Sequence, residues 1–121
     1  MPGNNLVRLL TIGVSLTMLA VAGGRGFRTQ DFLEDHYRRY GSGFGRISQT
    51  QYLHLAQQLR DARPGKNVLE MHRADGSGSK FDRRHGWFVA YDRDGTLRTF
   101  FVPKEGVRYF ERQPQNHAPP D

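Results

Sequence analysis

The stretch of sequence that decides the fold is NVLEMHRADGSGSKFDRRHGWFVAYDRDGTLRTFFVP, residues 67–103. It contains four short runs that are rich in Val, Phe, Tyr, Trp and Thr, and Gly76, Gly86 and Gly95 stand between them. Two of these glycines follow an aspartate, and Asp-Gly between two such runs is among the strongest hairpin signals. The pattern predicts an antiparallel meander of strands near residues 67–73, 79–83, 87–92 and 96–102.

Two helices are predicted ahead of these strands. Thr29 is placed as an N-cap, and apolar residues then recur at helical spacing until Gly41 ends the first helix. In ISQTQYLHLAQQLRDARPG, Ser48 and Gln51 form a capping box, and the final Pro-Gly pair ends the second helix. The sequence therefore predicts an α+β fold, with two helices packed on one face of a four-stranded antiparallel sheet.

Residues 1–22 have the composition of a secretory signal. Leu9 to Ala22 carry no charge, and this apolar run is too short to span a bilayer comfortably. The small residues Ala20 and Ala22 form a cleavage site of the A-x-A type. We expect cleavage after Ala22, export to the periplasm or the medium, and no stable membrane insertion afterwards. A buried N-terminal helix and a retained membrane anchor are the alternatives.

The remaining chain is expected to form one domain over residues 23–112. A chain of 121 residues is long enough for one ordinary domain and too short for two separate cores. Residues 113–121 offer no apolar side chain beyond one alanine to anchor them, which predicts a frayed tail.

The predicted domain is strongly basic. Lys and Arg outnumber Asp and Glu by 18 to 12 in the whole chain, and all but three of the basic residues are arginine. Removal of Arg8 with residues 1–22 leaves 17 basic and 12 acidic residues, a net charge of 17 − 12 = +5. Arginine presents a planar fork of donors that suits phosphate oxygens, so nucleic acid is the first partner expected, and a membrane surface the second.

The chain contains no cysteine, which excludes disulfides and thiolate metal sites. Its five histidines show neither HxxxH nor HExxH spacing, the patterns that place two imidazoles on one face of a helix. We therefore expect no metal and no other cofactor.

Alternation along the predicted strands decides which polar side chains can meet. In the last strand Thr99 shares a face with Leu97, and Arg98 lies on the other face. Lys80 lies in the second strand, and the pairing register decides which of these residues it joins. One face of the sheet can therefore gather Lys80 with either Thr99 or Arg98.

Several motifs occur in an order that resembles a known module. They are DHYRRYGSGFG, YLHLAQQL followed by a Pro-Gly loop, the strand region quoted above, and GVRYF. The order is similar to a module at the C-termini of bacterial polymorphic toxins and in phage head-associated proteins, which belongs to the barnase/EndoU/colicin/RelE-like (BECR) nuclease superfamily. The resemblance covers about residues 31–112, and residues 94–103 are its most specific part. It implies a metal-independent endoribonuclease with helices followed by a four-stranded antiparallel sheet.

Cleavage of RNA by the adjacent 2′-hydroxyl needs a base, an acid and fixed positive charge at the phosphorane. His36 is the first candidate for base or acid, because histidine titrates in the useful range. Lys80 and Arg98 are candidates to stabilise the phosphorane, and Thr99 to donate a hydroxyl hydrogen bond to a phosphate oxygen. Tyr109, in GVRYF, resembles a tyrosine that some members place against the substrate.

Further candidates would bind RNA without taking part in the chemistry. Arg38, Arg39 and Tyr40 lie near His36 in the sequence, and Arg83 and Arg84 lie at the end of the second predicted strand and just after it. In the module the first helix usually reads HxxxHG, whereas this chain reads HYRRYG, so Tyr40 stands at the second histidine. An unperturbed tyrosine has a pKa of about 10, which predicts weaker catalysis or none.

Each candidate also has a purely structural interpretation. His36 would cap the end of the first helix, where a cation interacts well with the helix dipole. Thr99 is a good strand former, and Lys80 and Arg98 would be solvated strand residues.

Two functions therefore remain open. The first is a secreted, monomeric toxin-type ribonuclease that acts in the cytoplasm of another cell and is neutralised by an acidic immunity protein or antitoxin. The second is an exported module of the same fold that binds RNA or another polyanion without turnover.

Overall fold

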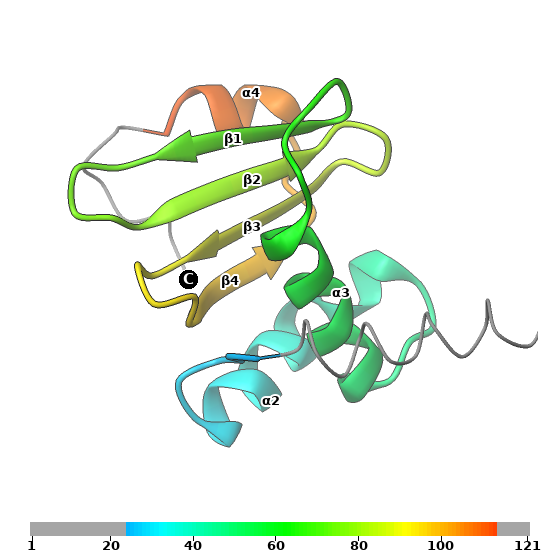
Figure 1. The fold of residues 1–121 in the computed structure, drawn as a ribbon. Helices are drawn as coiled ribbons and strands as arrows, with labels where there is room; N and C mark the ends of the chain where they lie inside the picture. Colours follow the sequence, from blue (N-terminus) through cyan, green and yellow to red (C-terminus); the bar gives the residue numbers. More distant parts are fainter. Residues whose placement is uncertain (1–23, 114–121) are drawn as a thin grey trace, which may run out of the picture.

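The computed structural model of the chain describes residues 24–113, so the expected signal segment and residues 114–121 of the expected tail lie outside it. Helices come first along the chain and a four-stranded antiparallel sheet follows, which confirms the α+β prediction (Figure 1). The elements are α2 (Gln30–Tyr40), the 3₁₀ helix η1 (Gly41–Phe44), α3 (Gln49–Asp61), β1 (Val68–His72), β2 (Gly78–Asp82), β3 (Trp87–Tyr91), β4 (Leu97–Phe101) and α4 (Val107–Glu111).

Both predicted helix starts are confirmed. The Thr29 hydroxyl accepts a hydrogen bond from the Phe32 amide at 3.1 Å and so caps α2. At α3, the Ser48 hydroxyl accepts from the Gln51 amide at 3.1 Å, and the Ser48 amide donates to Gln51 Oε1 at 2.8 Å. These two bonds form the predicted capping box.

The sheet is a meander with the strand order β1-β2-β3-β4. Each of its three turns contains a glycine with a positive φ angle: 90° at Gly76, 78° at Gly86 and 91° at Gly95. L-residues with side chains rarely adopt this backbone conformation, which is why glycine marks the turns so reliably in the sequence. The strand predictions are confirmed to within two residues at every boundary.

A register shift between Ala90 and Tyr91 corrects the predicted faces of β4. Thr99 pairs with Ala90, but Leu97 pairs with Tyr91, so Arg98 is an extra residue between them. Because of this bulge, Leu97 joins the core on the α3 side, and it does not share a face with Thr99. Strict alternation of side chains along a strand could not predict this bulge, because it assumes that each residue of β4 pairs with one residue of β3.

The sheet has a core on each face, because a third helix that the sequence did not predict, α4, covers the second face. On the first face, Val89 and Phe100 pack with Leu59 and Tyr52 of α3. On the second face, Phe81, Phe88 and Ala90 pack with Phe110 of α4, which lies on the opposite side of the sheet from α3 (Figure 1). Helix α4 was not predicted because its five residues are too few to show a helical period in the sequence. It also lacks a side-chain cap that would mark its start.

Helix α2 packs against β4, the edge strand of the sheet. The segment before α2 also reaches this edge, where Phe27 forms a parallel bridge with Leu97 and the Leu97 amide donates to the Gly26 carbonyl at 2.9 Å. The helix that carries His36 is therefore held beside the strand that carries Thr99.

Candidate functional site

His36 is buried on α2, and its ring is fixed from two sides. Its side chain stacks on Phe27 with ring centroids 4.9 Å apart, and Tyr40 lies 5.9 Å away. Nδ1 donates a hydrogen bond to the Phe32 carbonyl oxygen at 2.9 Å. Since a carbonyl only accepts, the neutral ring carries its proton on Nδ1, and the lone pair lies on Nε2. Nε2 is buried and has no hydrogen-bond partner among the described residues.

Two buried hydroxyls share this feature. Thr99 Oγ1 on β4 and Tyr109 Oη on α4 are buried and lack hydrogen-bond partners within residues 24–113. Burial raises the pKa of Tyr109 to about 12, with Tyr40 adding to the rise, and with Arg73 and the nearby side chain of Gln113 opposing it. The Tyr109 hydroxyl is therefore protonated at neutral pH and is able to donate. A buried polar group without a hydrogen-bond partner lowers the stability of a folded protein.

Ring contacts connect these groups across the edge of the sheet. Tyr40 packs on Phe101 at 5.3 Å between centroids, and Phe101 packs on Tyr109 at 5.3 Å. His36 lies at one end of this chain of contacts, next to Tyr40. Thr99 lies two residues from Phe101 on the same face of β4. A chain of ring contacts through Tyr40 and Phe101 thus links His36 on α2 to Tyr109 on α4, along the strand that carries Thr99.

Arg98 lies next to Thr99 and carries a positive charge. It occupies the bulge beside Thr99 and forms an ion pair with Asp92 through Nε. It also acts electrostatically on Arg73, a residue that follows β1 and is only 5% exposed. The guanidinium of Arg73 donates to Ser79 Oγ at 2.7 Å. We call His36, Arg73, Arg98, Thr99 and Tyr109 the edge cluster.

Lys80 lies on the opposite face of the sheet. Ser79 is in register with Ala90 and Thr99, whereas Lys80 is in register with Val89 and Phe100 on the α3 side. Neighbouring residues of a strand point to opposite faces. The expected gathering of Lys80 with Thr99 is therefore incorrect, because the register that decides it comes from the tertiary pairing.

The Lys80 side chain stabilises the end of α3. Its ammonium group donates to the carbonyl oxygens of Arg60 at 2.5 Å and Ala62 at 2.6 Å, and it lies 3.9 Å from Glu70 Oε2. Burial lowers the pKa of Lys80, and Glu70 opposes this shift. Carbonyls at the C-terminal end of a helix have no partner within the helix, so Lys80 supplies one.

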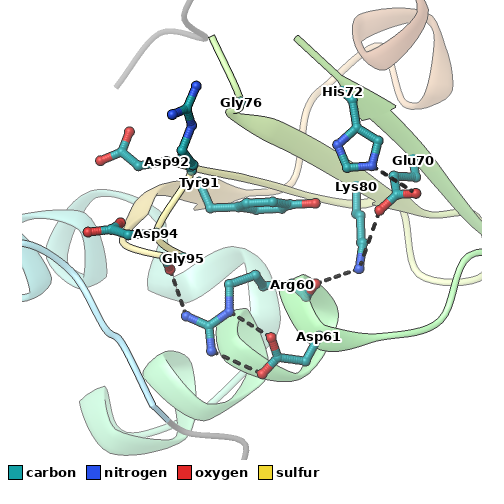
Figure 2. Close-up of a pocket in the computed structure, with 11 residues that line it drawn as sticks. Arg60, Asp61, Glu70, His72, Gly76, Lys80, Tyr91, Asp92, Asp94 and Gly95 are labelled. Atoms are coloured by element: carbon teal, nitrogen blue, oxygen red, sulfur yellow. Dashed lines mark hydrogen bonds and ion pairs between the residues drawn. The ribbon is translucent and has the colours of Figure 1, made fainter. Parts of the chain in front are cut away.

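A pocket of about 370 Å³ lies beside Lys80 on the α3 face. Figure 2 shows Tyr91 lying across it, with Lys80 pointing down toward the Arg60 carbonyl and Arg60 directed to Asp61 and the Gly95 carbonyl. The cationic groups of Lys80 and Arg60 are thus already bonded to the protein. The pocket is separated by the sheet from Thr99, and it carries no part of the function proposed below.

The arginines expected to bind RNA fall into two groups. Arg38 and Arg39 are exposed on α2 and form ion pairs with Asp35 at 3.2 and 2.5 Å. Arg83 and Arg84 are exposed in the β2–β3 turn, at the opposite end of the sheet from the β3–β4 turn beside Arg98. Only the α2 group lies near the edge cluster.

Sequence reasoning missed Arg73 and Ser79. Arg73 follows a predicted strand and precedes an Asp-Gly turn, where a solvated arginine is the ordinary expectation. No sequence pattern marked Ser79 as a site residue. Only the strand register places Ser79 in one row with Thr99.

Within residues 24–113, no group of three or more His, Asp and Glu side chains is placed to hold a metal ion. No helix in this part of the chain is long and apolar enough to cross a membrane.

No family model matches the sequence, and no curated protein matches it. The chain is similar to a solved structure of a ribonuclease from Escherichia coli in complex with its inhibitor protein. The identity is 15% and the TM-score is 0.46, and the match covers 65% of this chain and 95% of that chain. At this level of likeness, any assignment of function to this chain depends on its own residues.

Proposed function

We propose that this chain is a metal-independent endoribonuclease of toxin type, with the edge cluster as its active site. The support for it is that His36 Nε2 and the hydroxyls of Thr99 and Tyr109 are buried and lack hydrogen-bond partners among the described residues, and that Arg98 lies next to Thr99 in the bulge of β4. These are the groups that transesterification by a 2′-hydroxyl requires: a base, hydrogen-bond donors to the phosphate, and positive charge.

In this proposal His36 acts as the base. Nε2 takes the proton of the 2′-hydroxyl, and the 2′-oxygen forms a bond to phosphorus as the bond from phosphorus to the 5′-oxygen breaks. Tyr40, which adjoins His36 and receives a hydrogen bond from Arg39 at 3.4 Å, gives a proton to the leaving 5′-oxygen. The products are a 2′,3′-cyclic phosphate and a 5′-hydroxyl, and Tyr40 recovers its proton from His36 through solvent.

Thr99, Tyr109 and Arg98 stabilise the phosphorane in this proposal. Each hydroxyl donates to a non-bridging oxygen, and Arg98 contributes charge where negative charge develops. Fixed donors of this kind are most effective in a site that excludes water, and both Nε2 of His36 and Oγ1 of Thr99 are buried. RNA would reach them when half-buried side chains at the rim, such as Tyr40, turn aside.

The test is incubation of the domain with RNA in EDTA. We expect cleavage that leaves cyclic phosphate ends, and we expect His36→Ala to abolish it. His72→Ala is the matched control, because the His72 side chain is 70% exposed and belongs to a strand far from β4. Cleavage that depends on added metal, or that survives in His36→Ala, would contradict the proposal.

The burial of Nε2 and Oγ1 also favours the second function, an inactive module that binds RNA or another polyanion. Tyr40 in place of a second histidine supports the same reading. This function predicts RNA binding that weakens steeply with salt, without any product in the EDTA assay.

We also propose that the chain is exported and paired with an acidic immunity protein. The support is the apolar segment before residue 23 and the basic composition of the domain. Mass spectrometry of the protein recovered outside the producing cell should give an N-terminus at Gly23. Retention of the intact chain in the cell would contradict export.

A further inference from the structure

The β2–β3 turn carries an aromatic stack that faces the solvent. The imidazole of His85 lies on the indole of Trp87, with ring centroids 4.4 Å apart and an interplanar angle of 24°. Nδ1 of His85 donates to Asp82 Oδ2 at 2.7 Å, and the His85 amide donates to Oδ1 of the same carboxylate at 3.3 Å. The His85 side chain is nevertheless 54% exposed. The ring is thus fixed in orientation, although more than half of its side-chain surface is open to solvent.

The inner side of this stack is anchored in the protein core. Trp87 packs edge-on against Phe44 at 5.2 Å and against Phe100 at 5.9 Å between ring centroids. Phe44 in turn stacks on Phe100 at 4.3 Å, and Phe100 is fully buried on the α3 face of the sheet. A rigid aromatic surface of this kind offers a flat ligand a preformed partner, which lowers the entropic cost of binding.

Three cationic side chains surround the stack. Arg83 and Arg84 precede His85 in the turn, and Lys66 lies close by because the Arg83 amide donates to the carbonyl of the residue after it at 2.8 Å. All three cationic residues are exposed, and within the described part of the chain none of their side chains forms an ion pair or a hydrogen bond. The carboxylate of Asp82 is occupied by the turn itself. The turn therefore presents positive charge to the solvent next to an aromatic ring.

This stack lies at the end of the sheet where Tyr40 packs. In an antiparallel meander β2 and β4 run in the same direction, so the β2–β3 turn and the C-terminal end of β4 are at one end of the sheet (Figure 1). Tyr40 packs on Phe101 at that end of β4, and the next residue, Val102, is 38% exposed. Neighbouring strands lie about 4.8 Å apart, so the ends of β4 and β2 are about 10 Å apart. The stack is therefore about two strand widths from the strand end on which Tyr40 packs.

We propose that His85 and Trp87, with Arg83 and Arg84, form a platform that binds single-stranded RNA beside the active site. A nucleobase stacks on the outer face of the His85 ring, and the two guanidinium groups bind the phosphates of that strand. Every base has a π face, so the platform adds affinity without selecting a sequence. The fixed, exposed ring favours a nucleobase, because an acidic protein would need only the charges. The inference deepens the proposed function, on which it rests for the identity of the bound strand as substrate.

Trp87 is the only tryptophan of the chain, so its fluorescence reports on the platform directly. The full chain would be titrated with a single-stranded DNA, which lacks the 2′-hydroxyl and is not cut by this mechanism, and with an abasic strand of the same length and charge. We expect saturable quenching by the DNA and about tenfold weaker binding of the abasic strand. Absence of quenching, or equal affinity for the abasic strand, would overturn the platform. Equal affinity for an acidic polypeptide of the same charge would overturn it in favour of a protein partner.

Substitutions of His85 test the ring, with fluorescence anisotropy of labelled DNA as the readout. We expect His85→Ala to weaken binding about tenfold, and His85→Phe, which keeps an aromatic ring, to stay within about threefold of the parent. His72→Ala is the matched control, because it removes an exposed histidine from β1. Binding by His85→Ala that equals the parent would overturn the inference.

A double substitution tests the charge. We expect Arg83→Gln with Arg84→Gln to weaken binding of every single strand alike and to reduce the slope of log affinity against log salt by about two units. Arg93→Gln with Arg108→Gln is the control, because it removes the same charge from exposed residues of the β3–β4 turn and α4. An equal loss in both double variants would show that net charge alone attracts the strand, and the platform would fall.

The two proposals fail in different ways. If RNA is not cleaved in EDTA but DNA quenches Trp87 and His85→Ala loses affinity, the ribonuclease proposal fails and the platform stands. If RNA is cleaved, we expect His85→Ala to raise the half-saturating RNA concentration about tenfold and to leave the saturating rate unchanged. Cleavage by His85→Ala with the parent's rate and half-saturating concentration would remove the platform and leave the ribonuclease.

Discussion

Nδ1 of His36 donates a hydrogen bond to the carbonyl oxygen of Phe32, four residues earlier on the same helix, at 2.9 Å. This bond decides the tautomer of the neutral ring and leaves Nε2 as the atom that accepts a proton. The cost of holding that atom buried without a partner among the described residues is of the order of 1–3 kcal/mol.

His36→Gln should therefore separate turnover from binding. Glutamine is similar in length and polar, but its amide does not take up a proton at neutral pH. We expect RNA cleavage to fall by a factor on the order of 100 or more, while affinity for single-stranded DNA stays within about twofold. Single-turnover rates and anisotropy titrations measure the two quantities, and a loss confined to affinity would remove His36 from the chemistry.

Thr99→Val and Tyr109→Phe each remove one hydroxyl and little else. Because those hydroxyls have no partner in the described chain, we expect thermal stability to stay the same or rise, while cleavage falls on the order of 100-fold. Tyr52→Phe is the matched control, since the Tyr52 hydroxyl donates to the Phe100 carbonyl. It should lower stability by about 1 kcal/mol. Equal destabilisation by all three would argue that Thr99 and Tyr109 are structural.

Tyr40→His would restore the second histidine of the related module. A histidine can give and take protons near neutral pH, so we expect faster cleavage if Tyr40 supplies the proton to the leaving oxygen. Tyr40→Phe should slow cleavage, because it keeps the packing on Phe101 and removes the proton. Rates that are indifferent to both substitutions would assign Tyr40 to packing alone.

Lys80→Met should act on stability. It removes two hydrogen bonds to the carbonyls of Arg60 and Ala62 and leaves those groups without a donor, at a cost of about 2–4 kcal/mol. Chemical denaturation would measure this loss. In conditions where the variant is folded, we expect cleavage close to that of the parent. Abolished cleavage with unchanged stability would return Lys80 to the catalytic set.

Acid should weaken the hairpin turns at Asp75 and Asp94. Hydrogen bonds from Ser77 hold the pKa of Asp75 below its usual 3.8, and those from Thr96 do the same for Asp94. Because the folded pKa is the lower one, this stabilisation is complete above about pH 4 and is lost as the pH falls further. Asp75→Asn with Asp94→Asn should flatten the fall in melting temperature between pH 5 and 2, and the control Glu34→Gln should not. An unchanged slope in the double variant would contradict this assignment.

The strands, their turns and the starts of the two long helices were predictable because each depends on neighbouring residues. Gly76 and Gly95 mark turns through their own backbone freedom, and Thr29 and Ser48 cap helices through bonds that span three residues. Such features depend only on a few consecutive residues, so a local sequence pattern is enough to predict them.

Other features were decided only by tertiary structure, because they depend on register and on contacts between distant elements. The bulge at Arg98 separates Leu97 from Thr99, and the pairing of Ser79 with Ala90 puts Lys80 on the opposite face. The sequence by itself determined an α+β chain of basic composition, and it identified His36, Thr99 and Tyr109 as candidate site residues. The packing of α2 at the edge of the sheet and of α4 on its second face, and the burial of Arg73, depend on a register that no local pattern encodes.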